Sequence, residues 1–230
     1  MGKQAATEMP AAADQSGAAG QGSRLVHGRE LVTSSKRERI LAGMLEAVGS
    51  SGYDGASVRT VLDLTGLYRQ AFYDNFPDKD ACYLEAFDYG VERFEAMVVE
   101  AAAGQSTWQG KLRAGLAALL GALDSDPDVG RALIVEVHAA GQEALERRAE
   151  VMKRIAEFID SAREFSSEDD SPPPIAPEGI VAGIHAIVHA RLATGASDGF
   201  RELLPEFMYF AVLPYFGAEL AEAEMQSARA

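Results

Sequence analysis

A single glycine between two short helical patterns constrains the fold of this chain more than any other feature. Ser57 is a suitable N-cap for the segment VRTVLDLT, whose apolar residues recur at helical spacing: Val58, Val61, Leu62 and Leu64. Gly66 can adopt the left-handed conformation that ends such a helix, and a second helical pattern follows at once and stops before Pro77. The sequence therefore predicts a helix-turn-helix.

The second helix of this motif is predicted to have one buried and one exposed face. At about 100° per residue, one arc holds the residues expected to pack inward: Leu67, Tyr68, Ala71 and Phe72. Arg69, Gln70 and Tyr73 fall on the opposite arc, and their guanidinium, amide and phenol groups can reach base edges and phosphates in a major groove. We expect Arg69 to read a guanine and Gln70 an adenine.

The residues before the motif divide into an arm and a bracing helix. Residues 1–34 are rich in Ala, Gly, Ser and Gln with almost no periodic apolar pattern, which predicts a disordered arm. From Ser35, the stretch SKRERILAGMLEAVGSSG has apolar residues at spacings of three and four and ends in a glycine–serine cluster. Residues 35–80 are therefore predicted to form a three-helix DNA-binding domain.

The rest of the chain, residues 81–230, shows helical patterns only. Long amphipathic segments are separated by the breaks at Asp126 and Pro127 and by the proline-rich loop SSEDDSPPPIAP, and we find no strand-like alternation. The predicted fold class is all-α, with the helix-turn-helix domain followed by a C-terminal helical bundle.

Charge and composition exclude several other classes of protein. The net charge of −14 argues against indiscriminate binding to nucleic acid or to anionic membranes. Residues 35–80 are nearly neutral, with six basic and seven acidic side chains, so the acidity belongs to the C-terminal part. No apolar run is long enough to span a membrane, and the single cysteine, Cys82, suits a reducing cytoplasm, where we expect the protein to act.

Residues 37–88 resemble the tetracycline-repressor (TetR) family of transcriptional regulators. The similarity rests on Gly66 in the turn, on Phe72 followed by Tyr73, and on Phe76 and Lys79. The resemblance implies that Tyr73 and Lys79 contact DNA phosphates and that Phe76 locks the recognition helix to the helix after it. It also implies that the C-terminal bundle binds an effector and forms a dimer.

The sequence departs from the family pattern directly after the turn. The family often has a small hydroxyl residue, a basic residue, a glycine, and a threonine or serine where this chain has Tyr68, Arg69, Gln70 and Ala71. The operator sequence therefore cannot be taken from relatives. The full set of predicted DNA-binding residues is Lys36, Arg37, Ser57, Arg59, Tyr68, Arg69, Gln70, Tyr73, Asn75 and Lys79. Asn75 has an alternative role as a cap at the end of its helix.

A stripe of small residues on the penultimate helix suggests close approach of another helix. We predict a homodimer interface formed by Ala182, Ala186 and Ala190 with Phe207 and Phe210 of the last helix, which would suit the reading of two half-sites. The alternative is that the stripe packs within its own chain.

The predicted effector pocket lies in the C-terminal bundle, with walls drawn from Phe87, Phe94, Trp108, Leu112, His138, Met152, Phe158 and His185. This lining favours a hydrophobic or amphipathic small molecule, and neither a cofactor nor a catalytic site is expected. His185 and His189 have the spacing of two zinc ligands, but a pocket-lining or core role is favoured over a metal site. For Cys82, ordinary packing is favoured over a thiol with a lowered pKa.

The sequence thus predicts a dimeric regulator, in the first instance a repressor, that binds a palindromic operator and is released by its effector. Two alternatives remain at this point. One is a helical small-molecule-binding protein or enzyme that does not bind DNA. The other is a module whose helix-turn-helix docks against protein, which the sparse positive charge of residues 35–80 would suit.

Overall fold

The computed structural model describes residues 35–166, 171–195 and 199–229, so the predicted arm of residues 1–34 lies outside the described residues. The α-helices are α1 (Lys36–Ser51), α2 (Val58–Thr65), α3 (Arg69–Tyr73), α4 (Lys79–Ala102), α5 (Trp108–Ser125), α6 (Pro127–Ile134), α7 (Gln142–Asp160), α8 (Ala176–Ala193) and α9 (Leu204–Ser227). Short 3-10 helices are η2 (Glu136–His138), η3 (Ser161–Phe165) and η5 (Arg201–Leu203). No strand occurs in the described ranges, and the all-α prediction is confirmed.

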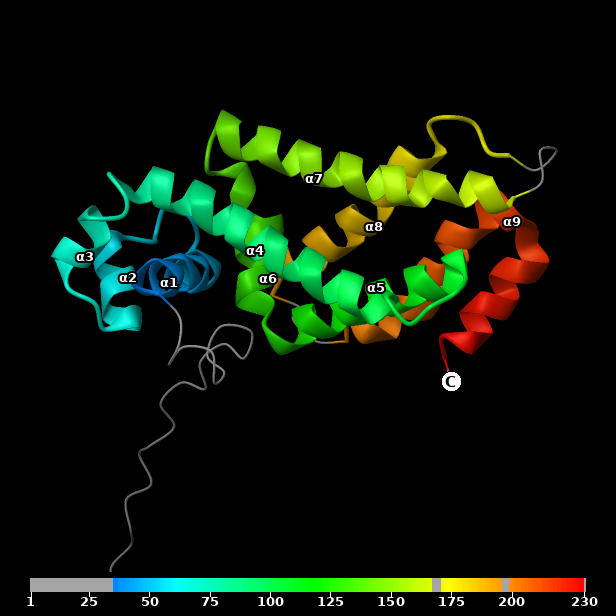
Figure 1. Cartoon of the computed structure of the whole chain (residues 1–230), viewed down its shortest axis with the longest axis horizontal. Helices are drawn as coiled ribbons and strands as arrows, with labels where there is room; N and C mark the ends of the chain where they lie inside the picture. Colours follow the sequence, from blue (N-terminus) through cyan, green and yellow to red (C-terminus); the bar gives the residue numbers. More distant parts are fainter. Residues whose placement is uncertain (1–34, 167–170, 196–198, 230) are drawn as a thin grey trace, which may run out of the picture.

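The helices form an elongated molecule with the helix-turn-helix at one end (Figure 1). Helices α1, α2 and α3 cluster there, and α4 leads from them into the larger bundle of α5, α7, α8 and α9. The C-terminal end of α9 lies at the opposite end of the molecule, far from α3. Helix α6 connects the two parts, since it contacts α1 on one side and α8 on the other.

Local signals set the ends of the first helices as the sequence predicts. Ser35 and Glu38 form a reciprocal capping box at the start of α1. The Ser57 hydroxyl accepts a hydrogen bond from the backbone N–H of Thr60, and Gly66 ends α2 in the left-handed conformation at φ 64°.

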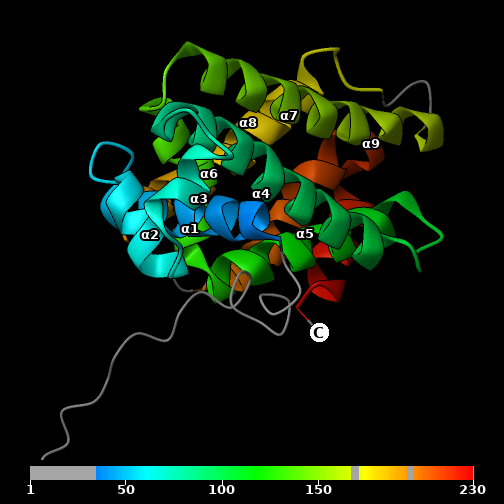
Figure 2. The ribbon, with the colours of Figure 1, turned by 60° about the vertical axis from the view of Figure 1, so that its left-hand side comes forward.

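The hydrophobic core under the helix-turn-helix extends into the rest of the molecule. Ile40 of α1, Phe72 of α3 and Tyr83 of α4 are fully buried in one cluster that also includes residues of α6 and α7. Helix α6 packs so closely on α1 (Figure 2) that a Cβ atom at Gly49 would lie 2.0 Å from the carbonyl oxygen of Asp128. A glycine is therefore required at this crossing.

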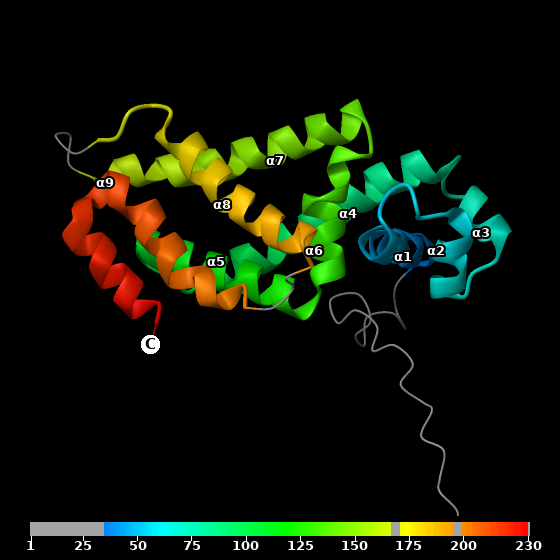
Figure 3. The same cartoon turned by 180° about the vertical axis from the view of Figure 1, so that it is seen from behind.

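Two helical segments of the C-terminal part are interrupted. The segment 128–140 is α-helical only to Ile134 and continues as the 3-10 helix η2. Helix α9 breaks at Gly217, whose φ of 78° and ψ of 175° are outside the helical range, shortly after Pro214. The chain therefore reverses direction within α9 and forms two arms, residues 204–216 and 218–227 (Figure 3).

Within the described part of the chain, every helix is too short or too polar to cross a membrane.

Candidate functional site

Helix α3 is held to the core by two phenylalanines and presents a polar outward side. Phe72 and Phe76 are both buried, with ring centroids 5.7 Å apart. Leu67 is partly buried against the same core. A five-residue helix is not stable by itself, so these contacts fix its position.

Tyr68 does not pack inward as the helical arc predicted. It is the residue before α3, has an extended backbone, and is 86% exposed. The 100° periodicity does not apply to a residue outside the helix, and this explains the error. Leu64 at the end of α2 is likewise 40% exposed instead of belonging to the buried stripe.

The outward side of α3 carries Arg69, Gln70 and Tyr73, as expected. The Arg69 guanidinium lies 5.3 Å from the centre of the Tyr73 ring and donates to its hydroxyl at 3.4 Å. Gln70 donates to the carboxylate of Asp74 at 2.6 Å. Tyr73 is 43% exposed. The arrangement can offer guanidinium, amide and hydroxyl donors to a groove edge.

Other predicted DNA-binding residues lie on α1, at α2 and just after α3, and most of them have local roles of their own. Lys36 is exposed at the start of α1. Arg59 is exposed on α2, 3.7 Å from Asp63, while Ser57 caps that helix. Asn75 donates to the carbonyl of Ala71 at 2.8 Å, as its alternative capping role requires.

Arg37 and Lys79 are engaged within the chain. Arg37 is ion-paired with Glu85 and lies 5.2 Å from the centre of the Phe76 ring. The Lys79 ammonium donates to the carbonyl of Tyr53 at 2.9 Å and lies 4.1 Å from the centre of the Tyr53 ring. This role of Tyr53 could not be predicted from the sequence, because Tyr53 and Lys79 are brought together by the packing of α4 against α1.

Tyr53 also links the helix-turn-helix to η2. Its backbone N–H donates to Glu136 at 2.9 Å, and its hydroxyl donates to Asp80 at 2.6 Å. Burial, together with the hydrogen bond to Asp80, raises the pKa of Tyr53. Glu136 in turn accepts from Arg131 of α6 at 3.1 Å.

The residues predicted to line the effector pocket lie in three places. Phe87 is buried in the core below the helix-turn-helix, and Phe94 lies between that core and the bundle. Four others belong to the outer part of the bundle: Trp108, Leu112, Met152 and Phe158. His138 and His185 lie in a third place, and the structure does not gather all eight side chains around one cavity.

His138 and His185 lie with Arg148 and His189 in a group that we call the Arg–His cluster. Nη2 of Arg148 is 3.4 Å from Nδ1 and 3.3 Å from Nε2 of His185. The ring centroid of His189 is 6.1 Å from that of His185 and 5.5 Å from that of His138. His138 of η2 therefore lies beside the histidine pair of α8. The arginine was missed because its helix has a strongly charged outer side.

Burial and neighbouring positive charge lower the pKa values of His185 and His138 and so favour their neutral forms. Burial, followed by Arg148, His189 and His138, lowers the pKa of His185 to about 4. Burial, followed by Arg148 and His189, also lowers the pKa of the more exposed His138. No group of three His, Cys, Asp or Glu residues in the described ranges is arranged to hold a metal ion.

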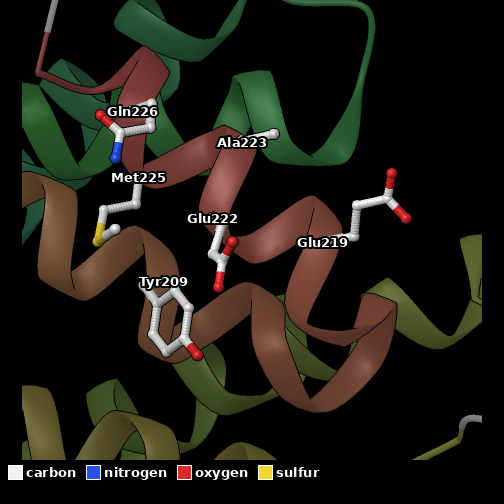
Figure 4. A pocket seen from close by; sticks show the side chains of 6 residues that line it. All are labelled: Tyr209, Glu219, Glu222, Ala223, Met225 and Gln226. Carbon is white, nitrogen blue, oxygen red and sulfur yellow. The ribbon is translucent and has the colours of Figure 1, made fainter.

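An open pocket of about 520 Å³ lies between the two arms of α9 (Figure 4). Its lining comes entirely from that helix: Tyr209, Glu219, Glu222, Ala223, Met225 and Gln226. None of these residues was predicted to bind the effector, because the reversal at Gly217 was not visible in the sequence.

Cys82 is fully buried in the core at the start of α4. Burial raises the pKa of its thiol to about 12, although Arg37 acts in the opposite direction. The favoured packing role fits this environment, and a lowered thiol pKa does not.

Of the predicted dimer residues, Ala182, Ala186 and Ala190 are exposed on α8. Phe210 of α9 is 43% exposed and covers Gly183, since a Cβ atom at that glycine would lie 3.0 Å from the Phe210 ring. Phe207 is only 2% exposed and packs inside its own chain, so it is not available at the surface of the monomer.

Solved structures share this architecture, although no protein-family model and no curated protein matches the chain. The fatty acid degradation regulator FadR from Bacillus halodurans aligns with a TM-score of 0.67 and 14% identity over 79% of this chain and 95% of that protein. FadR from Bacillus subtilis in complex with stearoyl-CoA aligns with a TM-score of 0.64 and 15% identity over 78% and 97% of the two chains. A regulatory protein of the TetR family from Rhodococcus RHA1 aligns with a TM-score of 0.62 and 15% identity over 80% of this chain and 99% of that protein.

These alignments cover more than three quarters of the chain, much more than the residues 37–88 that carry the sequence resemblance. The chain has the fold of TetR-family transcriptional regulators.

Proposed function

We propose that this protein is a ligand-responsive transcriptional regulator that binds a palindromic DNA operator as a homodimer. The observation that carries the proposal is the outward side of α3, where Arg69, Gln70 and Tyr73 are exposed on a helix fixed by Phe72 and Phe76. Residues 35–80 would bind DNA and residues 81–230 would bind the effector and dimerise. Repression is the mode of regulation that we propose, in the cytoplasm and without enzymatic activity.

The exposed face of α8 and α9 supports the proposed dimer. Figure 3 shows these two helices on one side of the molecule. Ala182, Ala186 and Ala190 expose only small side chains there, next to the large ring of Phe210. Small residues beside a large one allow a helix of a second subunit to approach closely. A two-fold dimer would place two α3 helices in successive major grooves, about 34–36 Å apart.

The proposed effector is a hydrophobic or amphipathic small molecule, and the complex of the Bacillus subtilis FadR with stearoyl-CoA supports this class. Its binding could be transmitted to DNA through the contact of η2 with the helix-turn-helix. Glu136 holds the backbone N–H of Tyr53, and α6 lies directly against α1 at Gly49. A coupling free energy of about 1–3 kcal/mol would suffice for release.

One observation favours the alternative of a small-molecule-binding protein that does not bind DNA. Much of the positive charge near α3 is already engaged, with Arg37 paired to Glu85, Arg59 near Asp63, and Lys79 bound to a carbonyl. An operator-binding protein needs cations for phosphates. Arg69 and the exposed Lys36 are the cations on which we rely.

The two functions are separated by selecting bound sites from a random pool of DNA duplexes. The wild type should enrich a palindromic site, and the double variant Arg69→Ala with Tyr73→Phe should lose it, because each lost base or phosphate contact costs about 1–3 kcal/mol. The matched control is Arg93→Ala with Tyr89→Phe, since Arg93 donates to Tyr89 at 3.4 Å in the same i, i+4 arrangement on α4. Failure of the wild type to enrich any sequence at low salt would favour the alternative.

A further inference from the structure

Arg148 differs from the preceding arginine of α7 in its surroundings. Arg147 is ion-paired with Asp88 and Glu143. Arg148 meets the imidazole of His185 instead, and no carboxylate of the described residues forms an ion pair with it. Its buried Nε has no hydrogen-bond partner there either. A guanidinium has five N–H donors in a fixed plane, so Arg148 presents donors that the chain does not use.

The other members of the Arg–His cluster are imidazoles, which offer N–H donors and carry no negative charge. The groups that shift the pKa of His185 by charge are Arg148 of α7, His138 of η2 and His189 of α8, and no carboxylate is among them. In a chain with 35 acidic and 21 basic side chains, a group of this kind without an acid is a specific arrangement. Its chemistry is complementary to an oxyanion.

The cluster lies between solvent and apolar side chains. His138 is exposed, whereas His185 is largely buried. Met152 follows Arg148 by about one turn of α7, and Ile184 precedes His185 on α8; both are partly buried against the hydrophobic clusters of the bundle. A ligand at this position would meet charge and hydrogen-bond donors at one end and apolar surface at the other.

We propose that the Arg–His cluster binds the oxyanion head group, a carboxylate or a phosphate, of an amphipathic effector whose apolar part packs beside Met152 and Ile184. Arg148 supplies the positive charge, and the imidazoles of His185 and His189 supply further N–H donors. The proposal rests on the proposed function in one respect, since it names the ligand of the effector-binding part. The site itself does not require that the protein bind DNA.

The test is calorimetric titration of the full chain with probes that share one alkyl tail. Dodecanoate and dodecyl phosphate carry the proposed head groups, dodecanol is the neutral control, and inorganic phosphate tests the head group alone. The variant is Arg148→Gln, and the matched control is Arg154→Gln, an exposed arginine of the same helix that pairs with Glu95. Circular dichroism establishes that each variant is folded. His189→Gln serves as a second variant if Arg148→Gln does not fold.

The wild type and Arg154→Gln should bind the two anionic probes at least about tenfold more tightly than dodecanol. Arg148→Gln should lose this preference and retain the affinity for dodecanol, and His189→Gln should reduce it. Binding of the anionic probes should also be accompanied by proton uptake, measured in buffers of different ionisation enthalpy, because a bound anion favours protonated imidazole.

Three results would overturn the proposal. They are equal wild-type binding of dodecanol and dodecanoate, an anion preference that persists in folded Arg148→Gln and His189→Gln, and binding of inorganic phosphate as tight as that of dodecyl phosphate. The DNA selection is scored separately on the unliganded protein. A site that binds anions in a protein that enriches no DNA would leave this proposal standing and remove the regulator function.

Discussion

At the scale of single residues, the basic side chains near α3 differ in what they can offer to DNA. Arg37 is ion-paired with Glu85, and Lys79 is bound to the carbonyl of Tyr53. Among the residues that the structure describes, Arg69 interacts only with the phenol of Tyr73, on the exposed side of the helix. We therefore expect the sequence specificity of the protein to depend on Arg69 more than on the other cations.

Lys79 should contribute both to stability and to DNA binding. Its ammonium group lies over the Tyr53 ring and donates to the Tyr53 carbonyl, and it has further donors for a phosphate. Lys79→Gln should lower the free energy of unfolding by about 1 kcal/mol in urea denaturation. In a plot of the logarithm of operator affinity against the logarithm of salt concentration, it should also make the slope shallower by about 0.9, the value for one lost phosphate contact. Lys111→Gln, an exposed lysine of α5, is the control. A lost stability with an unchanged slope would mean that Lys79 has no phosphate contact.

His185 should make the protein less stable in acid. Its pKa is lowered to about 4 in the folded chain, chiefly by burial, and lies near 6.5 in the unfolded chain. The neutral imidazole therefore contributes stability above pH 6.5, and this contribution is lost as the pH falls toward 4. After allowance for the exposed part of the ring, the loss should be about 1 kcal/mol.

The measurement for His185 is urea denaturation at pH 7.5 and pH 4.5. Wild type should lose more stability between these conditions than His185→Gln, which cannot take up the proton. His138→Gln should behave like the wild type, because His138 is exposed and its protonation costs less. Equal acid sensitivity of the wild type and His185→Gln would contradict the burial argument.

At the scale of helices, the ends that depend on local signals could be predicted and the others could not. Ser57 and Gly66 set the ends of α2 by hydrogen bonds and backbone conformation within a few residues. The reversal at Gly217 gives no such signal, because the glycine lies in a continuous apolar stretch and the preceding Pro214 is tolerated within the helix. The direction of the second arm is decided by packing against the bundle, which a local pattern does not encode.

The candidate sites also divide into one that local sequence signals predict and one that depends on packing between distant segments. The outward residues of α3 share one helix, so their common side could be predicted from spacing. The Arg–His cluster joins Arg148 of α7 to His185, which is 37 residues away on α8. Such a contact requires the relative placement of two helices, and the charged pattern around Arg148 in the sequence is equally typical of a solvated helix surface.

The reversal in α9 should require the glycine. Gly217 has φ 78° and ψ 175°, a conformation that is strained for any residue with a Cβ atom, at a cost of about 1–3 kcal/mol. Gly217→Ala should therefore lower the melting temperature in thermal denaturation. Gly104→Ala is the control, because no atom lies within 4 Å of a Cβ atom there and its φ is not positive. Equal melting temperatures of the two variants would show that the arms can reverse without this conformation.

At the scale of the whole molecule, the positions of the proposed sites explain how an effector could act on DNA. The Arg–His cluster includes His138, and two residues before it Glu136 binds the backbone of Tyr53 in the helix-turn-helix. His189 of the same cluster lies next to the face of α8 that carries the exposed alanines, as its position around the helix axis shows. A ligand at the Arg–His cluster would thus be close to the contact between Glu136 and Tyr53 of the helix-turn-helix domain. It would also be close to the proposed dimer face of α8 and α9.

The proposed dimer leads to a prediction about the full assembly. Ala186 is exposed near the middle of the small-residue stripe of α8, and in a two-fold interface it would lie near its own copy or near α9 of the partner subunit. Ala186→Glu should introduce a bulky carboxylate into each half of this interface and raise the dissociation constant of the dimer at least about tenfold in sedimentation equilibrium. Operator affinity should fall with it, because each monomer can occupy only one half-site. Val99→Glu adds the same charge at an exposed position of α4 that lies outside α8 and α9, and it should leave both quantities unchanged. If Ala186→Glu remained dimeric while Val99→Glu dissociated, the interface would have to be placed on the α4 side of the molecule, and the alanine stripe would have no role in assembly.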